Sequence, residues 1–209
     1  MQVCGVDDAG RGSAIGPLVI AGISIERRKI KQLMALGVKD SKQLTPRTRE
    51  NLYKKILELV DDYYVAKISP HMIDKSVQKN QLNQLEGKYM AKVIANLRPD
   101  SAYVDSCDVN PARFGLLISK LAHLDKVHSS HHADKRFPVV SAASIIAKIN
   151  RDRAIAKIRK EFDVGSGYPS DPKTMNFIRK AIASNGVPPK FVRKSWKPVK
   201  ILLGSAQSA

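Results

Sequence analysis

Short apolar runs rich in valine and isoleucine alternate along the chain with longer segments in which apolar residues recur every three or four positions. The short runs predict β-strands, and the longer segments predict amphipathic helices. The predicted strands cover residues 1–6, 17–25, 63–69, 102–105 and 126–128. The predicted helices cover residues 27–36, 45–60, 83–97, 111–124, 139–162 and 172–184.

Proline marks the start of three of these helices, at Pro46, Pro111 and Pro172. Its fixed φ and missing N–H suit the first position of a helix. The first two apolar runs, joined by a glycine-rich link, suit an antiparallel pair. Strands early in the chain and helices later favour a layered arrangement. The pattern therefore predicts an α/β fold in which helices flank a mixed β-sheet.

A break at residues 186–189, Gly-Val-Pro-Pro, separates a predicted main domain, 1–186, from a basic C-terminal segment, 187–209. Within that segment, residues 201–203 are apolar and predict an anchor, and residues 204–209 predict a frayed tail. Five basic side chains lie close together there, and their density indicates contact with phosphate rather than with solvent alone. They are Lys190, Arg193, Lys194, Lys197 and Lys200.

The composition indicates a folded protein with a polyanionic partner. Of 209 residues, 43% are hydrophobic, which is enough for a full core. Lys and Arg number 36 against 19 Asp and Glu, a formal net charge of +17. A thermophile-like surface would interleave acids with the bases, whereas here the acids are outnumbered. The excess points to nucleic acid in preference to a membrane surface.

Two cysteines, Cys4 and Cys107, are too few for a disulfide framework or a four-cysteine metal site. His131 and His132 are adjacent, which is weak spacing for zinc, so loop residues are the favoured interpretation. No apolar run approaches the length of about 18 residues that would predict a membrane span. We expect a cytoplasmic protein that acts as a monomer and has no membrane partner.

The first candidate site lies where Asp7 and Asp8 follow an apolar run and precede Gly10-Arg11-Gly12. Two carboxylates at the end of a buried strand repel each other, and burial makes it costly to keep both ionised. Mg²⁺ or Mn²⁺ is the natural counter-ion for clustered carboxylate oxygens. The glycines allow a ligand to approach the main chain, and the arginine can bind phosphate. Taken alone, an Asp-Asp pair is more often a solvated turn.

Asp105 and Asp134 share this setting, because Asp105 ends a predicted strand and Asp134 precedes the long helix. If the strands 1–6 and 102–105 are neighbours, all four aspartates converge at one end of the sheet. Such a set can hold two divalent ions about 3.5–4 Å apart, as in two-metal phosphodiester hydrolysis. Neighbouring strand residues face opposite sides, so Asp7 and Asp8 can share a site only where the strand breaks up.

Several motifs together resemble the type 2 ribonuclease H family (RNase HII) in its archaeal form. They occur in the family's order and span nearly the whole chain. The matching segments are GVDDAGRG (5–12), IGPLV (15–19), DSK (40–42), YVD (103–105), AD (133–134), VSAASIIAK (140–148), RDR (151–153), GSGYPSD (165–171) and, in archaeal members, VRKSW (192–196).

The resemblance implies an RNase H-like fold for residues 1–186 and an endonuclease that cleaves the RNA strand of RNA/DNA hybrids. It also implies incision 5′ of a ribonucleotide embedded in duplex DNA, leaving 3′-hydroxyl and 5′-phosphate ends, in DNA replication and repair. A replication clamp is a candidate protein partner.

By motif position, the resemblance implies that Asp7, Asp8, Asp105 and Asp134 bind two Mg²⁺ or Mn²⁺ ions. It implies that Gly10, Arg11 and Gly12 read the 2′-hydroxyl at the cut, that Tyr168 stacks beside that sugar, and that Lys42 contacts phosphate.

One position departs from the family pattern, which normally has Glu where this chain has Asp8. Aspartate is one methylene shorter, so its carboxylate reaches an ion with a different geometry. This leaves a second hypothesis open: a basic nucleic-acid-binding protein whose active site has decayed. Binding without cleavage in both Mg²⁺ and Mn²⁺ would favour that alternative.

Overall fold

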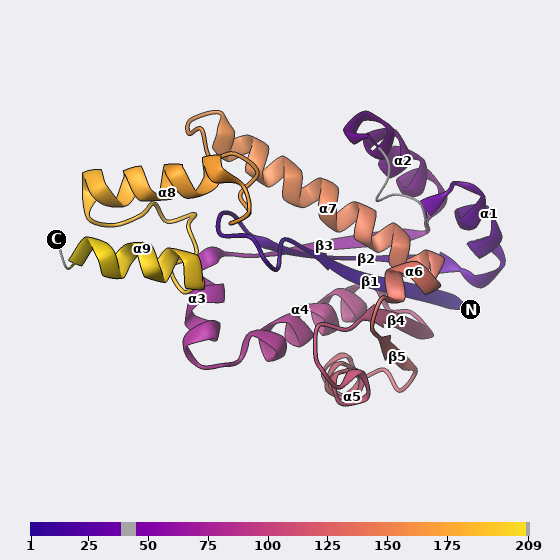
Figure 1. The fold of residues 1–209 in the computed structure, drawn as a ribbon. Helices are drawn as coiled ribbons and strands as arrows, with labels where there is room; N and C mark the ends of the chain where they lie inside the picture. The colour runs from indigo at the N-terminus through magenta and orange to yellow at the C-terminus, as the bar shows by residue number, and fades with distance from the viewer. Residues whose placement is uncertain (39–44, 208–209) are drawn as a thin grey trace. The chain divides into compact units, whose positions relative to one another are not determined.

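A five-stranded mixed sheet organises the part of the chain that the structure, a computed structural model, describes, residues 1–38 and 45–207 (Figure 1). The strand order is β3-β2-β1-β4-β5. β1 pairs antiparallel with β2 and parallel with β4, which pairs parallel with β5. The strands are β1 (Gln2–Ala9), β2 (Leu18–Glu26), β3 (Asp62–Ile68), β4 (Ser101–Asp105) and β5 (Val127–Ser130). The α/β fold with a mixed sheet is confirmed.

The helices begin largely where the prolines predict them. Thr45, Ser69, Asn110 and Asp171 each accept a hydrogen bond from a main-chain N–H two or three residues further on, and proline follows each of them. The helices are η1 (Arg27–Lys29), α1 (Ile30–Ala35), α2 (Pro46–Leu59), α3 (Pro70–Gln78), α4 (Leu82–Leu97), α5 (Pro111–Ala122), α6 (Ala133–Arg136), α7 (Pro138–Arg159), α8 (Pro172–Asn185) and α9 (Lys197–Gln207).

The chain forms two compact units, each with its own core. The first comprises residues 1–9, 19–66 and 83–150, and the second comprises residues 10–18, 67–82 and 151–209. In the first, side chains from β1, β2, α2 and α7 form the core. In the second, α8 and α9 pack together around residues that include Ile15, Ile178 and Val192 (Figure 1). The predicted boundary at residue 186 stays a prediction.

Two predictions of local structure were wrong, and one helix was missed. Residues 204–207 continue α9 instead of fraying, because Val199, Leu202 and Leu203 pack that helix into the second core. The helix α3 was not predicted, although Ser69 and Pro70 begin it as a capping residue and proline begin α2, α5 and α8. β1 runs on to Ala9, so Asp7 and Asp8 lie inside the strand and not beyond its end.

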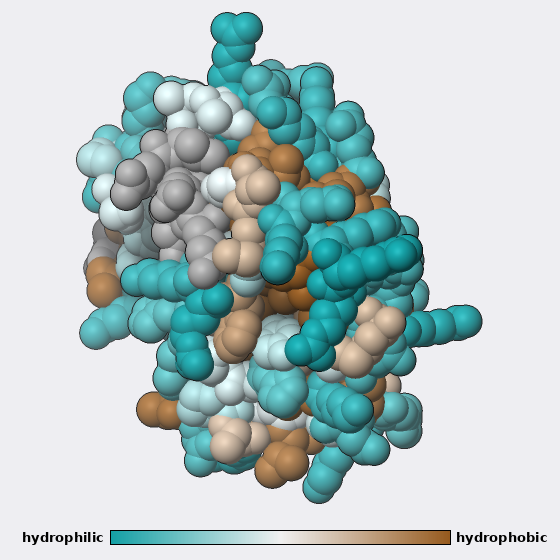
Figure 2. Space-filling model, turned by 90° about the vertical axis from the view of Figure 1, so that its right-hand side faces the viewer, coloured by the Kyte–Doolittle hydropathy of each residue, from teal (hydrophilic) through white to brown (hydrophobic). Residues whose placement is uncertain are grey.

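Hydrophilic side chains cover most of one face of the molecule. Figure 2 shows a face that is mainly hydrophilic, where hydrophobic side chains are visible only in small areas between protruding hydrophilic ones. Among the described helices, none combines the length and the apolar character that crossing a membrane requires.

Candidate active site

The strand pairing places two of the predicted acids side by side. β1 is the central strand, and its parallel register with β4 matches Val6 with Val104. The next residues along the two strands are Asp7 and Asp105. Asp7 is only 6% exposed, whereas Asp105 is half-buried at the end of β4. The parallel pairing of β1 and β4 therefore brings two carboxylates together at the same end of the sheet, as the sequence predicted.

Gly5 allows α7 to approach this part of β1. A Cβ atom at Gly5 would overlap the main-chain carbonyl of Val139, in the first turn of α7. The absence of a side chain thus lets the helix lie directly on the strand. One turn further along α7, the side chain of Ser144 hydrogen-bonds the Asp7 carboxylate.

The main chain ties the segment that carries Asp134 to Asp105. The Ala133 N–H donates to Asp105 Oδ1 at 2.6 Å, and Asp134 is the next residue, in α6. The Ser141 hydroxyl from α7 donates to the Asp134 carbonyl. Half-buried Asp134 is therefore held next to Asp105 through its main chain.

The electrostatics of Asp7 fit a divalent cation. Burial, and then the charges of Asp8 and Asp105, raise the pKa of Asp7 well above its usual range. Hydrogen bonds from Ser144 and from the Asp8 N–H, the latter 2.7 Å from Asp7 Oδ1, oppose this shift. A cation among these oxygens would favour the charged form. Hard carboxylate oxygens are the ligands that Mg²⁺ and Mn²⁺ prefer.

The acids are near one another, but they do not form a complete metal-coordination site. Over residues 1–38 and 45–207, no three His, Cys, Asp or Glu side chains are grouped tightly enough to hold a metal ion. Asp8 is half-buried and lies within the strand, where successive side chains point to opposite faces. Its charge nevertheless acts on Asp7. The donor types, hard carboxylate oxygens, fit a divalent ion.

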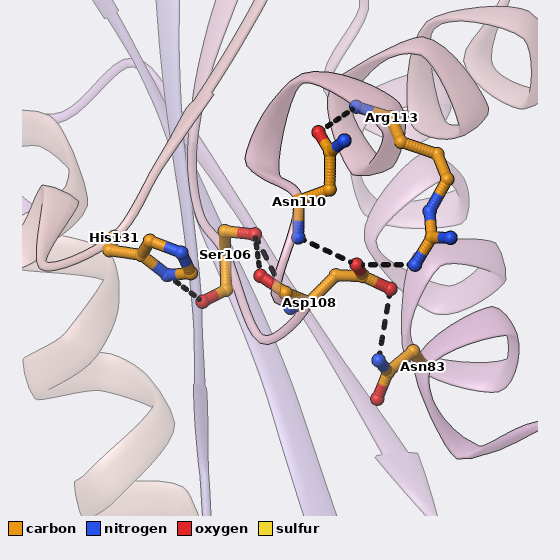
Figure 3. A network of polar contacts seen from close by, with 6 residues as sticks. All are labelled: Asn83, Ser106, Asp108, Asn110, Arg113 and His131. Carbon is orange, nitrogen blue, oxygen red and sulfur yellow. Dashed lines mark hydrogen bonds and ion pairs between the residues drawn. The ribbon is translucent and has the colours of Figure 1, made fainter.

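A polar network that the sequence analysis missed fixes the loop after Asp105 (Figure 3). Buried Asp108 accepts hydrogen bonds from Asn110 N at 2.9 Å, Arg113 Nη2 at 2.7 Å and Asn83 Nδ2 at 3.0 Å. These contacts lower the pKa of Asp108 to about 2, the Asn110 N–H having the largest effect. Alternating polar residues before Pro111 are the sequence signal that could have indicated this turn.

The same loop is joined to the last residue of β5 and to the residue after it. The Ser106 N–H donates to the Ser130 carbonyl at 3.0 Å, and His131 Nδ1 lies 3.4 Å from the Ser106 carbonyl. Figure 3 shows this histidine directed at Ser106. The loop is thus linked to the chain that leads into α6.

In the second unit, the Gly10-Arg11-Gly12 turn is held by the C-terminal segment. Gly10 has a φ of 87°, a left-handed conformation that favours glycine. Arg193 Nη1 donates to the Arg11 carbonyl at 2.8 Å, and Trp196 Nε1 donates to the Gly12 carbonyl at 3.2 Å. Nothing lies within 4 Å of a Cβ built at Gly12, so this glycine faces open space.

The prediction that Arg193 contacts phosphate is therefore wrong. It is fully buried, and its Nε donates to the Gly16 carbonyl at 3.1 Å. Its planar guanidinium instead braces two main-chain carbonyls of the N-terminal turn. The four lysines predicted with it, Lys190, Lys194, Lys197 and Lys200, are exposed.

Arg151 lies in one of the family motifs, but the sequence analysis assigned it no function. It joins this turn to the loop of Tyr168. Its guanidinium lies 4.2 Å from the centre of the Tyr168 ring. Its Nη2 donates to Ser13 Oγ at 2.9 Å and to the Ser166 carbonyl at 2.7 Å. The predicted sugar-reading turn and Tyr168 are therefore brought together within one unit. Lys42 lies outside the described residues.

Comparisons with known proteins show the family to which the chain is similar. The sequence model of the ribonuclease HII family matches residues 4–199. The chain is 52% identical to ribonuclease HII of Cenarchaeum symbiosum over 202 residues, covering 97% of this chain and 98% of that protein.

Two solved structures have the same fold. Ribonuclease H2 from Pyrococcus horikoshii superposes with a TM-score of 0.94 at 42% identity, covering both chains completely. The RNase HII in the PCNA:RNase HII complex from Archaeoglobus fulgidus superposes with a TM-score of 0.88 at 40% identity, covering 94% of this chain and 96% of that one.

Proposed function

The chain belongs to the ribonuclease HII family and is a metal-dependent ribonuclease H that acts on RNA/DNA hybrids, and on that premise we propose that it also incises duplex DNA 5′ of an embedded ribonucleotide. The products would carry 3′-hydroxyl and 5′-phosphate ends. The observation that carries the proposal is the buried Asp7 carboxylate, on which the charges of Asp8 and Asp105 act.

We assign Asp7, Asp8, Asp105 and Asp134 to a site for two Mg²⁺ or Mn²⁺ ions. Bound ions of this kind activate a water and stabilise the leaving oxygen of a phosphodiester. The chain's own contribution is to hold the acids in place and to offset part of the cost of ionising Asp7. Ser144 and the Asp8 N–H hydrogen-bond Asp7, while the Ala133 N–H orients Asp105 beside the segment of Asp134.

Recognition of a single ribonucleotide is assigned to the second unit. Gly10, Arg11 and Gly12 would read the 2′-hydroxyl, the group that distinguishes RNA from DNA. Support comes from the main-chain carbonyls of this turn, which two C-terminal side chains hold, and from the open space at Gly12. Tyr168, under Arg151, would stack beside the same sugar.

A replication clamp is a candidate partner, because a homologue 40% identical to this chain has been solved in complex with PCNA. Mixing the chain with a clamp of archaeal type and measuring a shift in sedimentation would test this.

A duplex with one ribonucleotide tests the proposed incision, with the same duplex carrying a 2′-deoxynucleotide there as the matched control. We expect cleavage of the first duplex alone, 5′ of the ribonucleotide, in Mg²⁺ or Mn²⁺. Cleavage of a fully RNA/DNA hybrid without cleavage of this duplex would refute the proposal. Binding of both substrates with cleavage of neither, in both metals, would favour the alternative that Asp8 marks a decayed active site.

A further inference from the structure

One face of α3 and the chain segment before α9 enclose a basic groove within the second unit. The groove has a volume of about 630 Å³. His71, Asp74, Lys75 and Gln78 line one side, spaced as one helical face, and Lys190, Val192 and Lys194 line the other as alternate residues. We name these seven residues the α3 groove.

Asp74 fixes the two sides of the groove to each other. It accepts hydrogen bonds from Lys194 N at 3.0 Å, Ser195 N at 2.8 Å and Ser195 Oγ at 2.5 Å. The one carboxylate of the groove is thus engaged with the main chain and a hydroxyl at its floor. Asp74 has a structural role here, and its oxygens are turned to protein donors.

The other polar side chains of the groove are donors. Lys75, Lys190 and Lys194 are exposed, as are His71 and Gln78. Three ammonium groups therefore stand against one carboxylate that is already hydrogen-bonded. Lysine binds phosphate as a flexible point charge, without the planar fork that arginine uses for a fixed geometry. Such a groove suits the backbone of a nucleic acid that is bound without recognition of its base sequence.

We propose that the α3 groove binds the phosphodiester backbone of the duplex substrate, away from the ribonucleotide that is cut. The proposal rests on the proposed function for the identity of the duplex. It differs from the sequence prediction in adding α3 to the phosphate contact and in leaving out Arg193, Lys197 and Lys200. Because its ligand is phosphate alone, the groove binds hybrid and all-DNA duplexes alike.

The test replaces Lys75, Lys190 and Lys194 together with glutamine, which keeps most of each side-chain stem. The matched control replaces Lys157, Lys160 and Lys180 with glutamine; these are exposed, lie in the same unit, do not line the groove and remove the same charge. Fluorescence anisotropy with a labelled hybrid and a labelled DNA duplex, in EDTA over a salt series, measures binding without cleavage. Thermal melting establishes that each variant is folded, and single Lys75→Gln serves if the triple variant is not.

We expect the groove variant to lose affinity for both duplexes and to flatten the slope of log K against log salt by about 0.9 for each phosphate contact removed. The control variant keeps the wild-type slope. Unchanged binding by the groove variant, or an equal loss in the control, would overturn the proposal.

The two proposals fail separately. If the groove variant loses affinity as expected while the wild-type chain does not cut at the ribonucleotide, only the proposed incision fails. If the wild-type chain cuts there and the groove variant binds normally, only the groove fails.

Discussion

Replacing Asp108 with asparagine perturbs the loop that follows Asp105 at its most strongly bonded point. One carboxylate oxygen accepts from Asn110 N and Arg113 Nη2, and the other accepts from Asn83 Nδ2. Asparagine keeps one acceptor and turns an NH₂ group toward a donor. An unsatisfied buried polar group of this kind costs about 1–3 kcal/mol.

The lowered pKa gives a second estimate of the stability that the Asp108 carboxylate contributes. The pKa of Asp108 is about 2 in the folded protein, compared with about 3.9 for an unperturbed aspartate. Full linkage would give about 2.6 kcal/mol of stability at neutral pH. Arg113 is largely exposed, so solvent screening reduces this to about 1–2 kcal/mol. Because the folded pKa is the lower one, this stability is present above about pH 5 and is lost as the pH falls toward about 2.

Urea unfolding of the wild type and Asp108→Asn from pH 7 to pH 3 measures this effect, with Glu58→Gln on α2 as an exposed control. We expect Asp108→Asn to be less stable by about 2 kcal/mol at pH 7, and we expect the difference to shrink at pH 3. A difference under about 0.5 kcal/mol at pH 7, or one independent of pH, would refute the reasoning.

Three further substitutions test other parts of the account. Gly5→Ala forces a Cβ against the Val139 carbonyl, and we expect it to lower the free energy of unfolding by about 2–4 kcal/mol, as measured in urea. An unchanged free energy of unfolding would show that α7 shifts freely. Asp8→Glu should raise turnover in Mg²⁺ more than in Mn²⁺, because Mg²⁺ demands near-ideal geometry; a fall in Mg²⁺ turnover would mean that the site is built around Asp8. Arg193→Lys keeps the charge but loses the fork that holds the Arg11 and Gly16 carbonyls, so melting temperature should fall, and an unchanged value would contradict its bracing role.

Local signals in the sequence predicted most of the fold. Proline at the first helical position located α2, α5 and α8, and valine- and isoleucine-rich runs located the strands. The short helix α3 also begins with proline, at Pro70 after Ser69, but the sequence analysis did not use this signal, and α9 was obscured by Gly204 and the small residues after it. The apolar positions of α9 are recognisable as part of a core only through their packing with residues far away in the chain.

The candidate site divides in the same way. Asp7 and Asp105 were predicted together because strand ends mark an edge of the sheet, and the register of β1 and β4 confirms that they are neighbours. Asp108 and Arg151 were missed as supports, since their partners are set by tertiary contacts and not by spacing. Arg193 was assigned to phosphate because the sequence gives its charge but not its burial.

Cleavage by Asp7→Asn tests the central claim most directly, with Glu58→Gln as the control for the loss of one negative charge. The substrate is the duplex with one ribonucleotide, with binding followed by anisotropy and products mapped in Mg²⁺ and in Mn²⁺. We expect Asp7→Asn to bind as tightly as the wild type or more tightly, since a carboxylate that repels phosphate is gone, and to lose cleavage in both metals. Glu58→Gln should bind and cut normally. Substantial turnover by Asp7→Asn at any concentration of either metal would contradict the assignment of the active site.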